Sequence, residues 1–200
     1  SEVKDFLGNV PYLAMCKMDG LTCSLTYENG VLVSAETRGD GKIGENILHN
    51  ALVIPTIPKK IPYKDILIVD GEIICTKNDF KEFENEFANP RNFAAGSIRL
   101  LDSKECSKRK LRFIAWDVIE GFDHLELLSK KLDRLKREHF IVVPYQNLPA
   151  IDADGSEVPL DIVVEQIQFE AQAKGFPIDG AVFKFDNIAY GKSLGETSHH

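Results

Sequence analysis

Lys17 and Asp19 are the first residues in the chain whose types and spacing could carry out chemistry, in the segment Lys17-Met18-Asp19-Gly20. In an extended chain, residues two positions apart point to the same side, so both side chains can share one pocket wall. An amine attacks phosphorus only when deprotonated, and its unperturbed pKa is about 10.4, so such chemistry needs a desolvating pocket or a second cation nearby. A solvated lysine beside an Asp-Gly turn would give the same four letters.

Three other segments place charged side chains where they could bind a nucleotide or a phosphate. Arg38 and Asp40 lie in a glycine-rich segment, TRGDG, where arginine and backbone N–H groups could reach a phosphate. Glu72 interrupts an aliphatic run, and Lys184 lies in DGAVFKFD on the side of the chain shared with Val182 and Asp186. A solvated turn arginine, an exposed glutamate and an exposed strand lysine are the alternative interpretations.

Residues 87–102, FANPRNFAAGSIRLLD, combine small residues with Arg91 and Arg99 and follow no simple amphipathic pattern. Small residues permit close backbone approach, and arginine binds phosphate with a planar fork of donors. Residues 91–112 contain seven cationic and two acidic residues, a net charge of +5 within a chain whose net charge is −7. We therefore expect this segment to contact nucleic-acid phosphates.

Period-2 alternation and turn residues indicate the elements that must position these side chains. We expect strands at 21–27 and 31–35 joined by an Asn29-Gly30 turn, and further strands at 65–76, 111–118, 140–145 and 179–186. We expect helices at 45–51, 79–87, 125–139 and 159–174, an extended connector at 53–62 and a loop at 37–46. Antiparallel strands with helices inserted between them indicate an α+β fold.

Composition narrows the class of protein. Hydrophobic residues make up 44% of the 200-residue chain and charged residues 28%, values typical of a soluble globular protein. No apolar run approaches the ~18 residues of a membrane span, and we expect no membrane partner. The four cysteines form neither a CxxC pair nor a metal-ligand spacing, so we expect reduced thiols in a cytoplasmic protein.

Taken in order, KMDG, TRGDGKIGEN, VDGE, FANPRNFAAGSIRLLD, LRFIAWDV, IDGAVFKFD and LGETS resemble the adenylation domain of bacterial-type NAD-dependent DNA ligases. The similarity runs from about Lys17 to Ser198. KxDG and DG-x-V-x-K are shared by all covalent nucleotidyltransferases, whereas the FANPRN segment is characteristic of the NAD-dependent branch. The resemblance implies one nucleotidyltransferase domain over residues 1–200, with an ATP-grasp-like ligase core of antiparallel sheets and packed helices.

The resemblance also implies a role for each candidate residue. Lys17, with Asp19 completing its motif, would attack the α-phosphorus of NAD, release nicotinamide mononucleotide and carry AMP. Arg38 would lie near the nucleotide phosphate or the 5′-phosphate of a DNA nick. Glu72 would bind the ribose, Trp116 would stack on adenine in place of the usual tyrosine, and Lys184 would approach the α-phosphate. Arg91 and Arg99 would hold phosphates of nicked double-stranded DNA. The family uses Mg²⁺, and no dedicated carboxylate cage is visible in the sequence.

The sequence departs from the family at several points. Met15 and Cys16 stand where the family has Glu-Pro, whose glutamate reads the adenine amino group, and Asp70 stands where an arginine is usual. The N-terminal nicotinamide-binding domain, the last active-site strand and the OB-fold are not in this sequence, so we expect the remaining ligase domains in cis or on a second chain. We expect the isolated 200-residue chain to seal nicks poorly or not at all.

Two other functions use the same residues. An ATP- or GTP-dependent nucleotidyltransferase would use Lys17, Glu72 and Lys184 equally, although the NPRN segment argues against it. A degenerate fold that only binds DNA or a partner protein is the second alternative. The intact set of Lys17, Asp19, Glu72 and Lys184 argues against that alternative, since binding alone does not require it.

Overall fold

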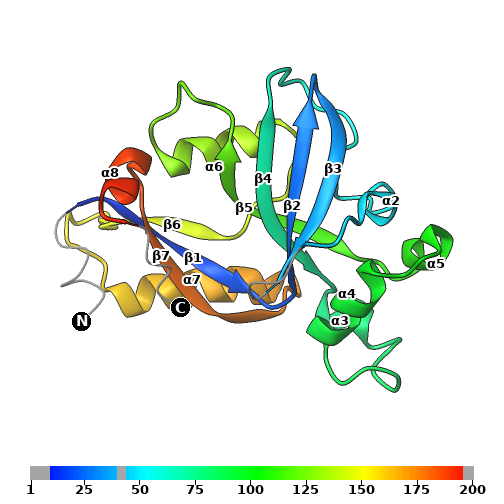
Figure 1. Ribbon diagram of the computed structural model, residues 1–200. Helices are drawn as coiled ribbons and strands as arrows, with labels where there is room; N and C mark the ends of the chain where they lie inside the picture. The colour runs from blue at the N-terminus through cyan, green and yellow to red at the C-terminus, as the bar shows by residue number, and fades with distance from the viewer. Residues whose placement is uncertain (1–9, 40–43, 196–200) are drawn as a thin grey trace.

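Two antiparallel sheets form the centre of the computed structural model, which describes residues 10–39 and 44–195 (Figure 1). The first sheet has the strand order β6-β1-β7 and contains β1 (Tyr12–Met18), β6 (Tyr145–Leu148) and β7 (Ile178–Phe185). The second has the order β3-β2-β4-β5 and contains β2 (Leu21–Glu28), β3 (Val31–Arg38), β4 (Leu67–Ile74) and β5 (Arg112–Glu120). The α+β fold with antiparallel sheets expected from the sequence is confirmed.

Helices cover the sheets and extend from one end of the second sheet. Helix α7 (Leu160–Ala173) packs on the first sheet and α6 (Leu128–Arg137) on β5, while α4 packs on β4 beside α3, and α5 lies beside α2 (Figure 1). The bounds of the remaining helices are Leu48–Ala51 for α2, Lys77–Phe80 for α3, Pro90–Ile98 for α4, Ser103–Ser107 for α5 and Ile188–Ser193 for α8. Among the described residues, no helix has the length and apolar character needed to cross a bilayer.

Local sequence explains the turns that join the central strands. Asn29 and Gly30 have φ values of 50° and 77°, as the expected tight turn between β2 and β3 requires. At the other end of β2, Gly20 passes so close to β4 that an added Cβ atom would lie 2.1 Å from the carbonyl oxygen of Ile73. Only glycine permits the chain to cross from the first sheet to the second at this point.

Three predicted elements differ from the structure. The helix expected at 79–87 is shorter and earlier, because Thr76 caps α3 and residues 81–86 form turns. The strand expected at 140–145 is wrong: Val142 forms only an isolated bridge with Ala115, and the paired strand is β6. The loop expected at 37–46 begins later, since β3 continues through Arg38. A local cap sets the start of α3, whereas strand pairing, which local pattern does not report, sets the other two boundaries.

The segment 87–102 contains α4 (Pro90–Ile98), which the sequence pattern did not predict. Asn89 caps the helix through its side chain, which accepts a hydrogen bond from the Asn92 amide, and Pro90 occupies the first turn, where its missing N–H costs nothing. Phe93 is fully buried among the rings of Phe80, Phe83 and Phe87. Part of the FANPRNFAAGS pattern is therefore a helix cap and an aromatic anchor that hold α4 in place.

Candidate functional site

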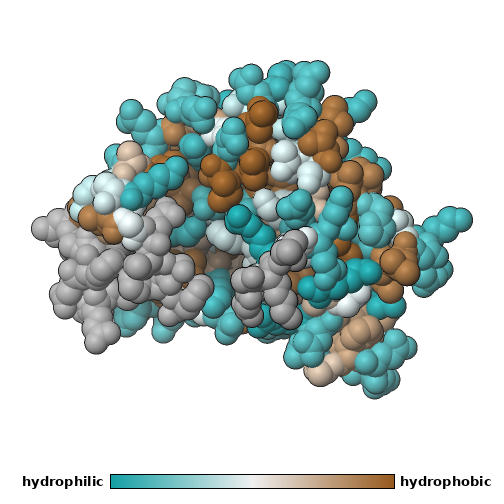
Figure 2. All heavy atoms as spheres, in the orientation of Figure 1, coloured by the Kyte–Doolittle hydropathy of each residue, from teal (hydrophilic) through white to brown (hydrophobic). Residues whose placement is uncertain are grey.

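A cleft of about 930 Å³ lies between the two sheets, and among the described residues it is lined by every candidate site residue from the sequence, whereas Asp186 is buried and accepts hydrogen bonds from Ser129. Asp40 lies outside the described residues. The lining includes Lys17, Asp19, Arg38, Glu72, Arg91, Arg99, Trp116 and Lys184. The face shown in Figure 2 is hollowed between the two sheets. Side chains that are up to 167 positions apart along the chain thus meet at one cavity, although their roles remain predictions.

Lys17 is placed by the end of β1 and by the crossing between the sheets. It is half-buried, and Asp19 two positions later is also half-buried and lines the same cleft. The backbone N–H of Asp19 donates to the carbonyl oxygen of Pro177 at 2.9 Å, which ties this segment to the start of β7. The amine therefore sits on a segment fixed from both sheets, a requirement for a positioned nucleophile.

Glu72 faces the cleft from the middle of β4. The hydroxyl of Thr22 donates to its Oε1 at 2.8 Å across the β2–β4 pairing. Burial raises the pKa of Glu72 to about 7, although hydrogen bonds from Thr22, from Trp116 and from the Gly20 backbone oppose that rise. A carboxyl group held in this way on a rigid strand can accept hydrogen bonds from the hydroxyl groups of a ligand.

A bulge in β5 brings two consecutive residues into the cleft. Gly71 of β4 pairs with Ala115 and Asp70 pairs with Asp117, so Trp116 is the extra residue on β5. In a regular strand neighbours alternate between faces, but a bulge re-aims one of them, and both Trp116 and Asp117 line the cleft.

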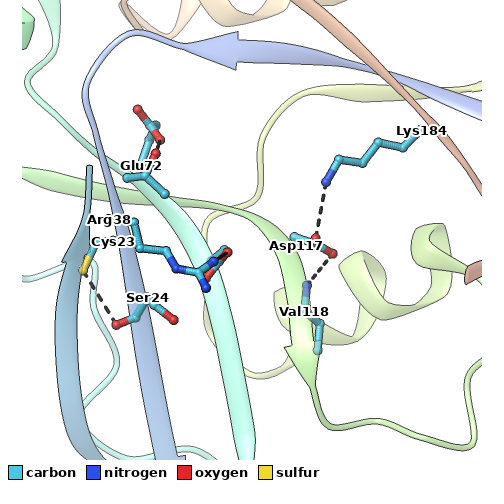
Figure 3. Close-up of polar contacts among 9 residues, drawn as sticks. Cys23, Ser24, Arg38, Glu72, Asp117, Val118 and Lys184 are labelled. Carbon is cyan, nitrogen blue, oxygen red and sulfur yellow. Dashed lines mark hydrogen bonds and ion pairs between the residues drawn. The ribbon is translucent and has the colours of Figure 1, made fainter. Parts of the chain in front are cut away.

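Lys184 extends from β7 across the cleft to this bulge (Figure 3). Its Nζ atom lies 3.3 Å from Oδ2 of Asp117 and 4.7 Å from the centre of the Trp116 ring. The other carboxylate oxygen of Asp117 accepts a hydrogen bond from the Val118 amide at 2.8 Å. An ammonium group, a carboxylate and an aromatic ring therefore meet at one point of the wall.

Arg38 is the last residue of β3, and its guanidinium reaches across β2 to Asp70, with Nη1 2.6 Å from Oδ2. This corrects the expectation of a flexible glycine setting, because the arginine is anchored to a strand. Asp70 is 1% exposed, and burial raises its pKa although Arg38 acts to lower it. Sequence reasoning noted Asp70 only as a departure and did not identify this ion pair.

Arg91 and Arg99 lie at the two ends of α4, and both line the cleft. Arg91 is exposed and close enough to Glu72 to act on its charge. Arg99 is held at 3.2 Å by Glu45 and donates a hydrogen bond to the Ala95 carbonyl oxygen. Arg91 is therefore the more available of the two for an external anion.

The basic segment 91–112 is largely compensated within the fold. Lys108, Lys110 and Arg112 pair with Glu105, Glu82 and Asp79 respectively. Arg109 lies over the rings of Phe83, Phe87 and Phe93, at 5.4 to 5.6 Å from their centres. The net charge counted along the sequence thus overstates the positive charge that this segment presents, because Glu82 and Asp79 come from outside it.

The two residues that precede Lys17 give the cleft an apolar lining. Met15 is 1% exposed, lines the cleft and pairs with Val182 of β7, so it offers no carboxylate to a ligand. Cys16 donates its Sγ–H to the carbonyl oxygen of Ile167, and burial raises its pKa to about 11. The described residues contain no group of three or more His, Cys, Asp or Glu side chains placed to hold a metal ion.

Two further lysines, which the sequence did not indicate, also line the cleft. Lys131 of α6 is buried and donates to the Gly121 carbonyl oxygen at 2.9 Å, and Lys192 lies on α8. Burial lowers the pKa of Lys131, and the nearby Lys192 adds to that effect. No sequence signal marked them, since lysines within amphipathic helices are ordinarily solvated.

Comparison with known proteins identifies relatives over nearly the whole chain. The family model of the NAD-dependent DNA ligase adenylation domain matches residues 2–200. The chain is 37% identical over 209 aligned residues to a DNA ligase of Ruminiclostridium cellulolyticum, covering 98% of this chain and 30% of that protein. It is 39% identical over 189 aligned residues to a DNA ligase of Nitratiruptor sp., covering 90% of this chain and 28% of that protein. The chain thus spans about three tenths of the length of these relatives.

A solved structure also shares the fold. The structure named Pmar-Lig_Pre aligns with a TM-score of 0.53 at 16% identity, covering 92% of this chain and 40% of that one. At this identity the likeness concerns the fold alone. It agrees with the two antiparallel sheets and packed helices described above.

Proposed function

The chain belongs to the family of NAD-dependent DNA ligase adenylation domains, and from this premise we propose that it accepts AMP from NAD on Lys17. The observation that carries the proposal is the convergence of Lys17, Glu72, Trp116 and Lys184 on one cleft. This set provides a nucleophile, a carboxyl group for hydroxyls, an aromatic platform and a cation for phosphate. Each of these groups would bind a different part of an adenine nucleotide.

In the proposed step, the Nζ atom of Lys17 forms a bond to the α-phosphorus of NAD. The bond between that phosphorus and the bridging oxygen breaks, nicotinamide mononucleotide leaves with the electron pair, and the amine loses a proton. Lys184 and Arg38 would stabilise the charge that develops on the phosphoryl oxygens. Asp19 would help to orient the lysine from its place two positions along the same wall.

The base and ribose would be held on the second sheet. Trp116 offers its ring face to adenine, and an indole stacks at least as well as a phenol. Glu72, which already accepts a hydrogen bond from Thr22, would accept another from a ribose hydroxyl. Because both side chains come from adjacent strands, their spacing would be rigid.

AMP would then pass to the 5′-phosphate of a nicked double-stranded DNA, and displacement of AMP by the 3′-hydroxyl would seal the strand. Arg91 and Arg99 would hold phosphates of the DNA backbone from α4. Because the chain spans only about 30% of its relatives, the remaining ligase domains would act in cis or as a second chain. We expect this chain alone to seal nicks weakly or not at all, as a cytoplasmic enzyme domain.

Mg²⁺ is used by the family, but the described residues provide no carboxylate cage for it. A magnesium ion would instead arrive with the phosphates of the nucleotide. No step in the proposed scheme assigns the metal to a protein ligand.

Intact mass measurement tests the proposed function directly. The chain is incubated with Mg²⁺ and either NAD or ATP, and the same is done for Lys17→Ala. We expect a gain of one AMP, about 329 Da, from NAD only, and no gain in the variant. A gain from ATP but not NAD would establish the rival donor. No gain with either, together with nicked-DNA binding that survives Lys17→Ala, would favour a binding module.

A further inference from the structure

Asp117 and Lys184 form an ion pair in the cleft. The proposed function gives this pair no role. The Lys184 Nζ atom lies 3.3 Å from Asp117 Oδ2 (Figure 3), and the same ammonium lies 4.7 Å from the centre of the Trp116 ring. A hydrogen-bond acceptor and a hydrogen-bond donor thus stand side by side at an aromatic platform. A stacked nucleobase presents its own donors and acceptors at its edge, in the plane of the ring.

Asp117 is oriented before any ligand arrives. Its Oδ1 accepts a hydrogen bond from the Val118 amide, which leaves Oδ2 directed at Lys184 and the cleft. The bulge in β5 places Asp117 directly beside Trp116 on the same wall, so a base stacked on the indole has its edge next to the carboxylate. Such pre-orientation is what a site needs to distinguish related ligands.

The other carboxylates in the described lining are less suited to reading a base. Asp70 is held by Arg38 at 2.6 Å, and Glu72 already accepts hydrogen bonds from Thr22 and Trp116. Asp19 lies beside Lys17, and Asp179 is exposed at the start of β7. The apolar Met15 provides no acceptor on the opposite sheet. Asp117 is the one that adjoins both an aromatic ring and an ammonium group.

We propose that Asp117 reads the edge of the purine that stacks on Trp116 and makes the cleft select adenine. Lys184 would move from Asp117 to the phosphoryl oxygens, as in the proposed step, and the Oδ2 atom released in this way would accept a hydrogen bond from the 6-amino group. This inference rests on the proposed function, which makes an adenine nucleotide the ligand. Hypoxanthine reverses the order, with an acceptor at position 6 and a donor at N1, so its oxygen would face the carboxylate.

Equilibrium binding of AMP and of IMP tests the assignment without any catalytic step. Trp116 is the only tryptophan in the chain, so quenching of its fluorescence reports stacking of the base. We expect AMP to bind more tightly than IMP by roughly 5- to 150-fold, the range for one well-directed base contact. In Asp117→Asn the amide can either accept or donate, so the ratio of the two dissociation constants should fall to within about twofold of unity.

The matched control is Asp123→Asn, which removes an exposed carboxylate outside the cleft lining and should leave the ratio unchanged. A structural role for Asp117 would weaken AMP and IMP equally and preserve the ratio, and that result would overturn the inference. No preference for AMP in the unmodified chain, or no binding of either nucleotide, would overturn it as well. Failure of NAD to adenylate Lys17, with the AMP preference intact and dependent on Asp117, would count against the proposed function alone.

Discussion

The guanidinium of Arg38 is held 2.6 Å from the carboxylate of Asp70 across the intervening strand β2. The two partners are unequal, because the side chain of Arg38 is 55% exposed and that of Asp70 is 2% exposed. The arginine would be solvated without its partner, whereas the aspartate would remain buried without a cationic partner. Loss of Arg38 should therefore cost more free energy of unfolding than loss of the Asp70 charge.

This asymmetry predicts the effect of breaking the pair from either side. We expect Arg38→Ala to lower the free energy of unfolding by about 1–3 kcal/mol, because the buried carboxylate of Asp70 loses its partner. Asp70→Asn should cost less, and Arg38→Ala combined with Asp70→Asn should be more stable than Arg38→Ala alone. Urea unfolding of the four proteins completes the double-mutant cycle. Equal losses in the two single variants would contradict this account.

The raised pKa of Glu72 should make the stability of the fold depend on pH. Burial raises its folded-state pKa from 4.5 to about 7, so the folded state binds more protons than the unfolded state between these values. Stability contributed by this group is thus full below pH ~4.5 and is lost as pH rises toward ~7. Between these pH values we expect the free energy of unfolding of the unmodified chain to fall by up to about 3 kcal/mol. Glu72→Gln should not show this fall.

The measurement for Glu72 is urea unfolding of the unmodified chain and of Glu72→Gln at pH 5 and pH 8. Glu120→Gln, an exposed carboxylate at the end of β5, serves as the control and should follow the unmodified chain. If Glu72→Gln and the unmodified chain lose the same stability between the two pH values, Glu72 does not titrate in this range.

The close approach of Gly20 to β4 leaves no room for a larger residue at this position. A Cβ atom at this position would lie 2.1 Å from the Ile73 carbonyl oxygen, a backbone atom that cannot move without disturbing β4. We expect Gly20→Ala to destabilise the fold by about 1–3 kcal/mol or more. At Gly39 an added Cβ atom meets none of the described residues within 4 Å, so Gly39→Ala is the matched control for the free energy of unfolding. Thermal or urea unfolding compares the two, and equal stability would refute the close approach.

The two arginines Arg91 and Arg109 should differ in their effects on DNA binding. Arg91 is exposed at the cleft, whereas Arg109 lies over three phenylalanine rings and donates to the Ser97 hydroxyl. If Arg91 contacts one phosphate, Arg91→Ala should reduce the slope of log affinity against log salt by about 0.9. Arg109→Ala should leave the slope unchanged and instead lower the free energy of unfolding by about 1–2 kcal/mol.

Fluorescence anisotropy with a labelled nicked duplex at several salt concentrations measures these slopes. Lys104→Ala, an exposed cation on α5 outside the cleft lining, provides a control for loss of positive charge alone. A change of slope in Arg109→Ala but not in Arg91→Ala would reverse the assignment of the two residues.

Several strands and turns could be predicted from local patterns. The alternation of Leu21, Cys23 and Leu25 with polar residues indicates β2, and Asn29-Gly30 indicates the turn that follows it. These features are local, since they depend on side-chain alternation and on backbone conformations available at single residues. The segment 140–145 looked equally strand-like, yet Val142 forms only an isolated bridge with Ala115, and the paired strand begins at Tyr145.

The family and most of the candidate groups could be identified without the fold, because the motifs around Lys17, Glu72 and Lys184 are contiguous in the chain. How those groups are paired could be seen only once the strands were placed. Asp70 meets Arg38 across β2, Asp117 enters the cleft through a bulge, and three cations of the segment 91–112 pair with carboxylates outside it. These relations depend on strand register and on contacts between residues far apart in sequence, which no local periodicity encodes.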